Sequence, residues 1–454
     1  AGRYDWVVSF DLNSLYPHLI MQYNISPETL VEKRHPSATV NKILSQKIDI
    51  PKEYAVCANG AMYRKDIHGF LPEIMQKIYD ERVQSKKLML VAKQEYEKTP
   101  TKDLEKKISK YNNIQMARKI QLNSAYGAIG NQYFRYYNLK NAEAITMSGQ
   151  VSIRWIEHEM NLYLNKILKT EKEDYVIASD TDSIYLNLGP LVEGVYKGRE
   201  KTDKSVVSFL NKICSMELEK HISRSYKALA AYVNAYDQKM IMKRENIAST
   251  GIWTAKKRYM LNVWDSEGVR YDEPKLKMMG IEAVKSSTPA PCRTAIKNAI
   301  QVMMNGTEDD LLSYIDTFKT EFNSLPPEDI AFPRSVNGLR KFKASGTVYS
   351  KGCPLHVRGT LLYNFYIAKN KLEYKYPLVQ EGEKIKYVYL LRPNPLGNEN
   401  VISFLNTFPR ELDLDESIDR DAQFKKSFLD PLRIITDVIE WDIERVPNLE
   451  FLFA

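Results

Sequence analysis

The sequence predicts an α+β fold, in which long helices and an antiparallel β-sheet occupy separate stretches of a chain of 454 residues. Three stretches indicate it. Residues 71–98 are charged, poor in glycine and periodic, as expected of a long helix. Residues 175–188 place two β-rich apolar runs around a short polar turn, which is typical of a hairpin. Residues 252–282 have a β-ribbon pattern with the turn Asp-Ser-Glu-Gly at 265–268.

The first part of the chain combines a buried strand with two long helices. An apolar run predicts the strand at residues 4–12. The breaker Thr-Pro-Thr-Lys-Asp at 99–103 separates helix 71–98 from a second long helix. That second helix is predicted to run until Gly127 and Gly130 stop it. The two helices then form a hairpin inserted between other elements.

The rest of the chain is expected to be richer in helix. Helices are predicted over residues 141–168 and 204–235, on either side of the β-hairpin. From residue 288 onward the pattern is mostly helical, with proline and glycine interruptions near 325–360.

Composition describes an ordinary soluble protein with a mild basic bias. The formal net charge is +8, which is compatible with a polyanionic partner but is weak support for one. The four cysteines are far apart and form neither a zinc spacing nor a disulfide framework, which suits a reducing compartment. Since there is no signal peptide and no apolar run long enough to span a membrane, we expect a cytoplasmic protein without membrane contact.

Carboxylates stand at the ends of the predicted strands. In extended backbone, residues i and i+2 point to the same face, so Asp180 and Asp182 at the hairpin tip are expected to crowd one spot. A solvated turn is the common alternative, and Asp-x-Asp alone is a weak signal. If Asp11 lies on the neighbouring strand, three carboxylates can hold two Mg²⁺ ions roughly 3.5–4 Å apart, as in-line nucleotidyl transfer requires.

The helical hairpin carries a basic stripe. Lys119, Asn123 and Tyr126 are spaced i, i+4 and i+7, so they share one face of the second helix. Arg82 and Lys86 are four residues apart on the first helix. Together these residues could grip a triphosphate and stack on a base. An isolated stripe of this kind is more often a solvated face, but the carboxylates elsewhere favour the functional interpretation.

Four motifs, in this order, resemble those of the family B DNA polymerases: FDLNSLYP (10–17), KIQLNSAYG (119–127), SDTDS (179–183) and TAKKRY (254–259). The resemblance extends over essentially the whole chain and is strongest to the replicative polymerases of T-even-type bacteriophages. The segments that resemble these phage polymerases are MYRKDIHGFLPEI (62–74), FRYYNLKNAEAIT (134–146), KKRYMLNVWDSEG (256–268) and GCPLHVRGTLLYN (352–364).

The resemblance implies a right-hand architecture: an antiparallel β-sheet palm at residues 1–71 and 129–284, helical-hairpin fingers at 72–128, and a mostly helical thumb with a C-terminal tail at 285–454. It also implies that the family's N-terminal and exonuclease domains are missing, either by truncation or because another polypeptide supplies them. The expected location is the cytoplasm, that of a bacterial host if a phage encodes the chain.

The resemblance also implies roles for single residues. Asp11 and Asp182 would be the main ligands of two Mg²⁺ ions, for which Mn²⁺ substitutes, with Asp180 supporting and the Leu12 carbonyl touching a metal. Lys119 would give a proton to the pyrophosphate leaving group. Tyr16 would exclude ribonucleotides by a clash with the 2′-hydroxyl, and Tyr126 would back the nascent base pair. The residues expected to bind the deoxynucleoside triphosphate are Ser14, Leu15, Tyr16, Arg82, Lys86, Lys119, Asn123 and Tyr126.

Contacts with primer–template DNA are expected mostly through its backbone and minor groove. Arg358 is as readily explained by packing in the thumb. An apolar C-terminal tail is expected to dock on a sliding clamp, with a packed terminus as the alternative. The tail residues are Leu449, Phe451, Leu452 and Phe453, and the residues expected to bind DNA are Lys256, Lys257, Arg258, Tyr259, Lys285, Ser286 and Arg358.

Three positions depart from the family pattern: Ser179 stands where glycine is usual, His18 where serine is common, and Lys243 where the phage relatives tend to have an acid. The leading prediction is template-directed DNA synthesis. One alternative is the DNA-binding half of a split polymerase that is inactive without an N-terminal partner. Another is a palm-type polymerase that makes RNA, against which Tyr16 argues.

Overall fold

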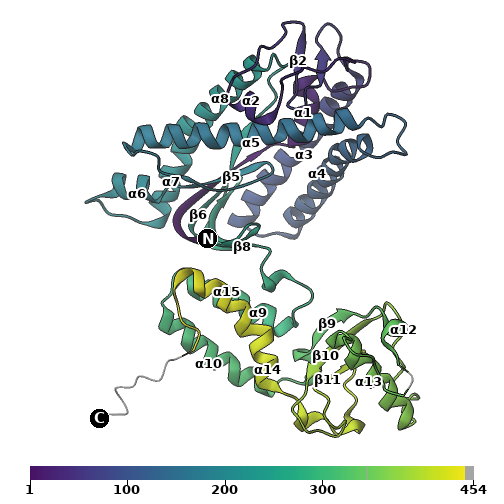
Figure 1. Cartoon of the computed structure of the whole chain (residues 1–454). Coiled ribbons are helices and arrows are strands. Elements are labelled where there is room, and N and C mark those ends of the chain that lie inside the picture. The colour runs from purple at the N-terminus through teal and green to yellow at the C-terminus, as the bar shows by residue number, and fades with distance from the viewer. Residues whose placement is uncertain (345, 445–454) are drawn as a thin grey trace. The chain divides into compact units, whose positions relative to one another are not determined.

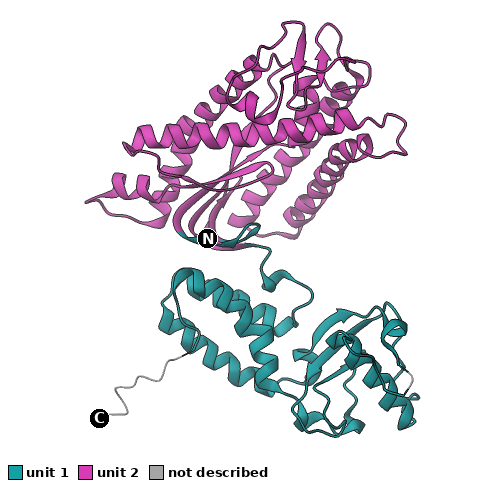
Figure 2. Cartoon of the chain, in the orientation of Figure 1, with its two compact units in different colours: residues 1–3, 252–260, 278–454 teal, residues 4–251, 261–277 magenta. Residues whose placement is uncertain are grey.

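The computed structural model describes residues 1–344 and 346–444, which divide into two compact units (Figures 1 and 2). Unit 2 consists of residues 4–251 and 261–277, and unit 1 of residues 1–3, 252–260 and the chain from 278 onward. Helices and antiparallel strands are both present, as the α+β prediction required.

A six-stranded sheet with the order β4-β5-β1-β6-β7-β8 supplies most of the strands of unit 2, and only the ends of β1, β6, β7 and β8 are assigned to unit 1. β1 pairs antiparallel with β5, and Asp11 lies opposite Ser183. The predicted first strand and the predicted hairpin are therefore confirmed, and they are neighbours. The strands are β1 (Gly2–Leu12), β4 (Val176–Asp180), β5 (Ser183–Asn187), β6 (Met242–Ala255), β7 (Arg258–Ser266) and β8 (Val269–Met279).

The predicted helical hairpin is confirmed as α3 (Phe70–Lys98) and α4 (Lys102–Ile129). The breaker between them supplies the cap of α4, because the Thr101 side chain accepts a hydrogen bond from the Leu104 backbone N–H. The predicted stop at Gly127 is wrong: α4 continues to Ile129 and is capped by Gly130. A glycine inside a helix costs about 1 kcal/mol, and the buried side chain of Ile129 offsets that cost by packing in the core.

Other helices pack around the sheet. α5 (Leu139–Leu168) confirms the helix predicted from residue 141 and contributes many of its side chains to the core of unit 2. The single helix predicted at 204–235 is a continuous helical stretch interrupted by one π-helical turn: α7 (Asp203–Ile213), the turn Cys214–Leu218, and α8 (Glu219–Tyr232). The remaining elements are α1 (Leu15–Tyr23), α2 (Val40–Leu44), β2 (Tyr54–Val56), β3 (Met62–Arg64) and α6 (Gly189–Tyr196).

Unit 1 is less helical than predicted. It contains a three-stranded antiparallel sheet in the order β11-β10-β9, from β9 (Phe332–Ser335), β10 (Lys384–Tyr389) and β11 (Val401–Phe404). The prediction failed here because these strands are short, and β9 pairs with a strand about fifty residues away, so no local turn signal marks it. The helices are α9 (Ala290–Asn305), α10 (Glu308–Ser324), α11 (Pro327–Ile330), α12 (Leu339–Phe342), α13 (Leu355–Lys369), α14 (Arg420–Phe424) and α15 (Asp430–Ile439).

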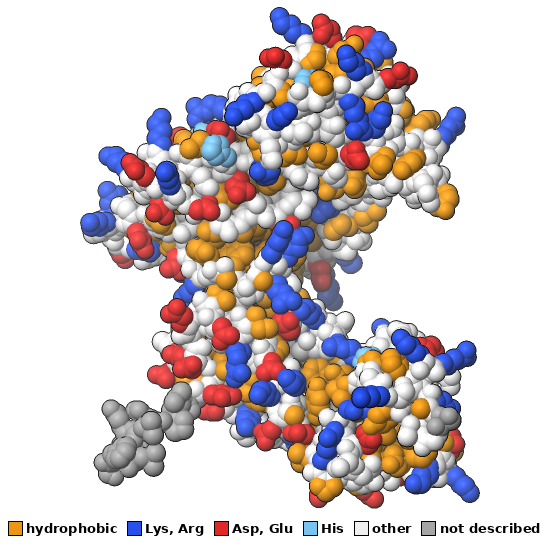
Figure 3. All heavy atoms as spheres, in the orientation of Figure 1, with side chains coloured by type: hydrophobic (Ala, Val, Ile, Leu, Met, Phe, Trp, Pro, Cys, Tyr) orange, Lys and Arg blue, Asp and Glu red, His pale blue; other side chains and the backbone are white. Residues whose placement is uncertain are grey.

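Two surface properties complete the description. Acidic and basic side chains are interspersed over the face shown in Figure 3, in keeping with 65 Lys and Arg against 57 Asp and Glu, so net charge does not locate a site. No helix within residues 1–344 and 346–444 is long and apolar enough to cross a bilayer. The predicted clamp-binding residues Leu449, Phe451, Leu452 and Phe453 lie outside the described residues.

Candidate active site

A cavity of about 250 Å³ lies in unit 2 where the end of β1, the tip of the β4–β5 hairpin and the helices α3 and α4 converge. It gathers the predicted metal-binding and nucleotide-binding residues with one exception, Asp180. The lining residues are Asp11, Leu12, Asn13, Ser14, Leu15, Tyr16, Arg82, Lys86, Lys119, Asn123, Tyr126, Thr181 and Asp182.

Backbone contacts hold the two carboxylate-bearing segments together. The Leu12 N–H donates to the Asp182 carbonyl at 2.8 Å, immediately after the pairing of Asp11 with Ser183. Ser14 then adopts a left-handed conformation (φ 51°) and the chain turns directly into α1. This sharp turn brings Leu15 and Tyr16 to the wall of the same cavity.

The backbone between Asp180 and Asp182 is not extended, contrary to what the prediction assumed. Thr181 has φ 57°, which is rare for a β-branched residue, and the Asp182 N–H donates to the Asp180 carbonyl across this tight turn at 2.6 Å. The i, i+2 rule applies only to extended chain, so it does not place the two carboxylates on one face at this turn, although the charge of Asp180 still acts on Asp182. Asp182 lines the cavity, whereas the Asp180 carboxylate accepts a hydrogen bond from the Thr181 hydroxyl at 3.0 Å.

Crowded, partly buried carboxylates dominate the electrostatics of the cavity. Burial raises the pKa of Asp11 to about 7, and the carboxylates of Asp182 and Glu245 add to the effect, while Lys86 and Lys119 oppose it. Burial also raises the pKa of Asp182. A cation bound between these groups would offset the free energy of holding like charges together.

Glu245 is a part of this arrangement that sequence reasoning missed. It lies on β6, the strand beside β1, where one carboxylate oxygen accepts from the Ser9 hydroxyl at 3.3 Å and the other pairs with Lys277 at 2.9 Å. The sequence signal was an acid in a strand two residues after the unusual Lys243. Its relevance depends on the order of strands in the sheet, which the sequence does not state.

The donor set suits Mg²⁺ better than a metal that needs a complete protein cage. Within the described parts of the chain, no three His, Cys, Asp or Glu side chains are gathered closely enough to form such a cage. Mg²⁺ is usually held by one or two carboxylates, with water and substrate phosphates completing its shell. Asp11 and Asp182 line the cavity and could supply two such ligands, whereas the expected third, Asp180, does not line it.

Basic side chains face the carboxylates from the helical hairpin. Arg82 is only 8% exposed; its guanidinium donates to the Ser14 hydroxyl, and its Nε is buried without a hydrogen-bond partner. Burial lowers the pKa of Arg82, but the side chain stays charged because the ordinary pKa of arginine lies far above neutral pH. Lys119 forms no ion pair in the part of the chain that the structure describes, and it lines the cavity. An oligophosphate would supply acceptors for both groups.

Aromatic and imidazole rings shape the end of the cavity next to α1. The rings of Tyr16 and Tyr126 are in contact, with centroids 4.6 Å apart and a tilt of 41°. His18 is buried, its Nδ1–H donates to the Ser14 carbonyl at 3.0 Å, and its ring lies edge-on to Tyr79. Burial lowers the pKa of His18 to about 4, so this departure from the family pattern is a neutral supporting residue.

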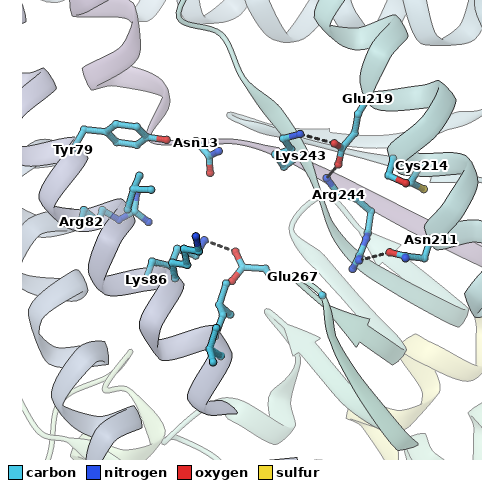
Figure 4. A pocket seen from close by; sticks show the side chains of 16 residues that line it. Asn13, Tyr79, Arg82, Lys86, Asn211, Cys214, Glu219, Lys243, Arg244 and Glu267 are labelled. Carbon is cyan, nitrogen blue, oxygen red and sulfur yellow. Dashed lines mark hydrogen bonds and ion pairs between the residues drawn. The ribbon is translucent and has the colours of Figure 1, made fainter. Parts of the chain in front are cut away.

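A larger cavity, of about 620 Å³, adjoins the first and shares Asn13, Arg82 and Lys86 with it (Figure 4). Both of its carboxylates are paired: Glu267 with Lys86, and Glu219 with Lys243 at 2.6 Å. The unusual Lys243 therefore has a structural partner. The third departure, Ser179, likewise donates to Glu157 at 3.2 Å.

The residues predicted to bind DNA belong to unit 1 and do not line either cavity. Lys256 and Lys257 are exposed at the turn between β6 and β7, with Arg258 next to them. Tyr259 is only 8% exposed and stacks on Trp253. The other predicted DNA-binding residues differ in their exposure and contacts. Lys285 pairs with Glu282 at 2.7 Å, and Ser286 is exposed. Arg358 is half-buried, donates a hydrogen bond to Asn400 and lies over the Tyr349 ring.

Comparison with known proteins identifies the family of this chain. The family model described as DNA polymerase family B matches residues 2–427. The DNA-directed DNA polymerase of Escherichia phage RB69 is 35% identical, with all of this chain and 55% of that protein aligned, and that of Enterobacteria phage T4 is 34% identical, with all of this chain and 56% of that protein aligned. A DNA polymerase of Pyrococcus glycovorans is 25% identical over 88% of this chain and 42% of its own length. The chain thus spans about half the length of the phage relatives, and it belongs to DNA polymerase family B.

Proposed function

We propose that the chain is a template-directed DNA polymerase core that transfers nucleotides from deoxynucleoside triphosphates to a primer 3′-hydroxyl. The observation that carries the proposal is the smaller cavity: carboxylates from the end of β1 and from the β4–β5 turn face cations from a helical hairpin. This is the charge distribution that a metal–triphosphate complex needs. Family membership supports the same reaction.

Asp11 and Asp182, with the Leu12 carbonyl, would hold the metals, which we propose to be two Mg²⁺ ions replaceable by Mn²⁺. Asp180 has a supporting role, through its charge on Asp182. When bound, the metals activate the attacking hydroxyl and stabilise the charge on the leaving phosphate oxygens. Because the pKa of Asp11 is raised to about 7, its carboxyl group would be partly protonated near neutral pH when no metal is bound.

The chain's own cations and rings would orient the nucleotide. Arg82 presents a fork of donors to phosphate oxygens, whereas Lys86 and Lys119 act as point charges, and the Asn123 amide adds a donor. Lys119 is also the proposed donor of a proton to pyrophosphate. Tyr16, held against Tyr126, would meet a ribose 2′-hydroxyl as a steric clash.

The proposal extends to the whole family architecture. The helical hairpin would be the fingers, the six-stranded sheet the palm, and the chain from 285 onward the thumb. The exposed turn at Lys256 and Lys257, with Arg258 beside it, would track the primer–template backbone. A sliding clamp at the C-terminal tail and an N-terminal exonuclease-containing polypeptide are the proposed protein partners, in the cytoplasm of a bacterial host.

Primer extension tests the proposal directly. The chain is incubated with a short primed template, Mg²⁺ and the four deoxynucleotides, beside an Asp182→Ala variant. Extension by the parent and not by the variant is the expected result. If neither extends the primer, the chain is the DNA-binding half of a split polymerase, and adding the N-terminal exonuclease fragment should restore synthesis.

The sugar gate has its own test. Tyr16→Ala opens the space beside Tyr126, so ribonucleotide incorporation relative to deoxynucleotide incorporation should rise by about tenfold or more. Tyr79→Ala, which removes a ring that contacts His18, is the matched control and should leave the ratio unchanged. An unchanged ratio in Tyr16→Ala would show that the gate assignment is wrong.

A further inference from the structure

We propose that Glu267 is a stand-in for the phosphates of the nucleotide: its carboxylate holds the Lys86 ammonium before a triphosphate binds, and takes it back when pyrophosphate leaves. The inference rests on the proposed function and adds a positioning residue to it. No covalent step is involved, because one counter-ion of Lys86 replaces another.

The position of the ion pair is the first observation. Lys86 lines both cavities, whereas Glu267 lines only the larger one. The Lys86 ammonium pairs with the Glu267 carboxylate, and both side chains are about one-third exposed or less (26% and 33%) (Figure 4). The pair therefore draws a predicted phosphate ligand toward the larger cavity, while Lys86 still acts on Asp11 in the smaller one.

The second observation is that hydrogen bonds hold the backbone of the turn that carries the glutamate, whereas the lysine side chain is long and flexible. Glu267 and Gly268 form the two-residue turn between β7 and β8, and both have the positive φ (52° and 90°) that such a tight turn requires. The Glu267 N–H donates to the Glu245 carbonyl at 2.6 Å, and the Gly268 N–H to Asp265 at 3.0 Å. Lys86 carries its charge on a flexible four-carbon stem. The lysine is thus the partner that moves.

The third observation is that Glu267 acts on both cations that α3 presents to the smaller cavity. Burial lowers the pKa of Arg82, and the charges of Glu267 and Asp11 oppose that shift. The buried Nε of Arg82 has no hydrogen-bond partner. A triphosphate offers several charged oxygens to Lys86 and Arg82 at once, so it outcompetes a single carboxylate. Pyrophosphate, once released from the nucleotide, meets the repulsion of the same carboxylate on its way out.

The test is equilibrium binding of Mg²⁺–pyrophosphate, and of a deoxynucleoside triphosphate in the presence of primed template, by calorimetric titration. Glu267→Gln keeps the shape of the side chain and removes its charge. We expect both ligands to bind about fivefold more tightly, a size typical of one partly screened charge, and the gain to shrink at high salt. KM for the nucleotide should fall in parallel while kcat stays constant or falls, because pyrophosphate leaves more slowly.

A matched control separates this exchange from a loss of negative charge in general. Glu273→Gln removes one carboxylate from an exposed position on β8, six residues further on, and Glu273 lines neither cavity. It should leave pyrophosphate binding unchanged. In a Lys86→Met background, Glu267→Gln should no longer tighten binding. Equal tightening with and without Lys86 would overturn the exchange.

Folding and the proposed function are tested separately. Melting temperatures show whether each variant folds. If Glu267→Gln does not fold, Glu267→Asp replaces it in the binding measurements, because its shorter side chain withdraws from Lys86. Unchanged or weaker pyrophosphate binding in a folded Glu267 variant overturns the inference, even if the parent extends primers. The opposite outcome is a parent chain that does not extend primers and a Glu267 variant that binds pyrophosphate more tightly than the parent. That outcome keeps the inference and overturns the polymerase proposal.

Discussion

The two cavities that share Arg82 and Lys86 differ in whether their carboxylates are paired with cations of the chain. In the larger one, both lining carboxylates, Glu219 and Glu267, are paired with a lysine. In the smaller one, neither Asp11 nor Asp182 forms an ion pair within the described residues, and burial raises the pKa of both. Charges balanced within the chain support the fold. Charges left unbalanced in a buried site cost stability that a bound cation can offset, which is typical of functional sites.

The largest expected effect separates two carboxylates on one hairpin. Asp182→Asn should lower the rate of primer extension by more than about a thousandfold, because it removes a proposed metal ligand from the smaller cavity. Asp180→Asn changes the same chemical group two residues away, outside the lining, and should cost about tenfold or less. Equal losses would mean that lining the cavity does not decide catalytic importance.

The paired region should show its largest effect in stability. Asp265 is 1% exposed and is bonded to Arg244, which lines the larger cavity, and to Arg270 at 2.9 Å. Asp265→Asn leaves Arg244 buried without its counter-ion and should lower the free energy of unfolding by about 3 kcal/mol. Urea denaturation measures this.

The exposed pair of Lys275 with Glu97 supplies the control for that experiment, since the lysine side chain is 54% exposed. Lys275→Gln should change the free energy of unfolding by less than about 0.5 kcal/mol. A loss as large as that of Asp265→Asn would contradict the distinction between buried and exposed pairs.

The carboxylates of the smaller cavity, unpaired within the described residues, should make the free energy of unfolding depend on pH. The pKa of Asp11 is about 7 in the folded chain against 3.8 ordinarily, so the folded state binds the extra proton between these values. The stability that this proton contributes is present below pH 3.8 and is lost as pH rises through 7. With a chelator present, the free energy of unfolding should fall by up to about 1.4 kcal/mol per pH unit in this window. Asp11→Asn should flatten the slope, and identical slopes would contradict the assignment.

The smallest effect is expected from Glu219→Gln. The change breaks a pair whose lysine side chain is 59% exposed, so the free energy of unfolding should fall by less than about 1 kcal/mol. Primer extension should stay at the level of the parent. A tenfold loss of extension would show that the larger cavity takes part in catalysis and would break the comparison.

Local signals were sufficient for much of the fold. Charge and periodicity predicted α3, the Thr-Pro break predicted the boundary between α3 and α4, and two β-rich apolar runs around a polar turn predicted the β4–β5 hairpin. The spacing of Arg82 and Lys86, and of Lys119 and Asn123, placed four of the cavity's side chains on two helix faces. These features depend on interactions within a few residues, and such interactions are encoded where they act.

Tertiary structure alone decided the rest. Glu245 reaches the carboxylates only because β6 lies beside β1, and Glu267 meets Lys86 across 181 residues of sequence. The left-handed Thr181 breaks the extended backbone between Asp180 and Asp182, and β9 pairs with β10 about fifty residues away without a local turn. Strand order, long-range ion pairs and strained turns are settled by the packing of the whole unit, because their free energy comes from partners distant in sequence.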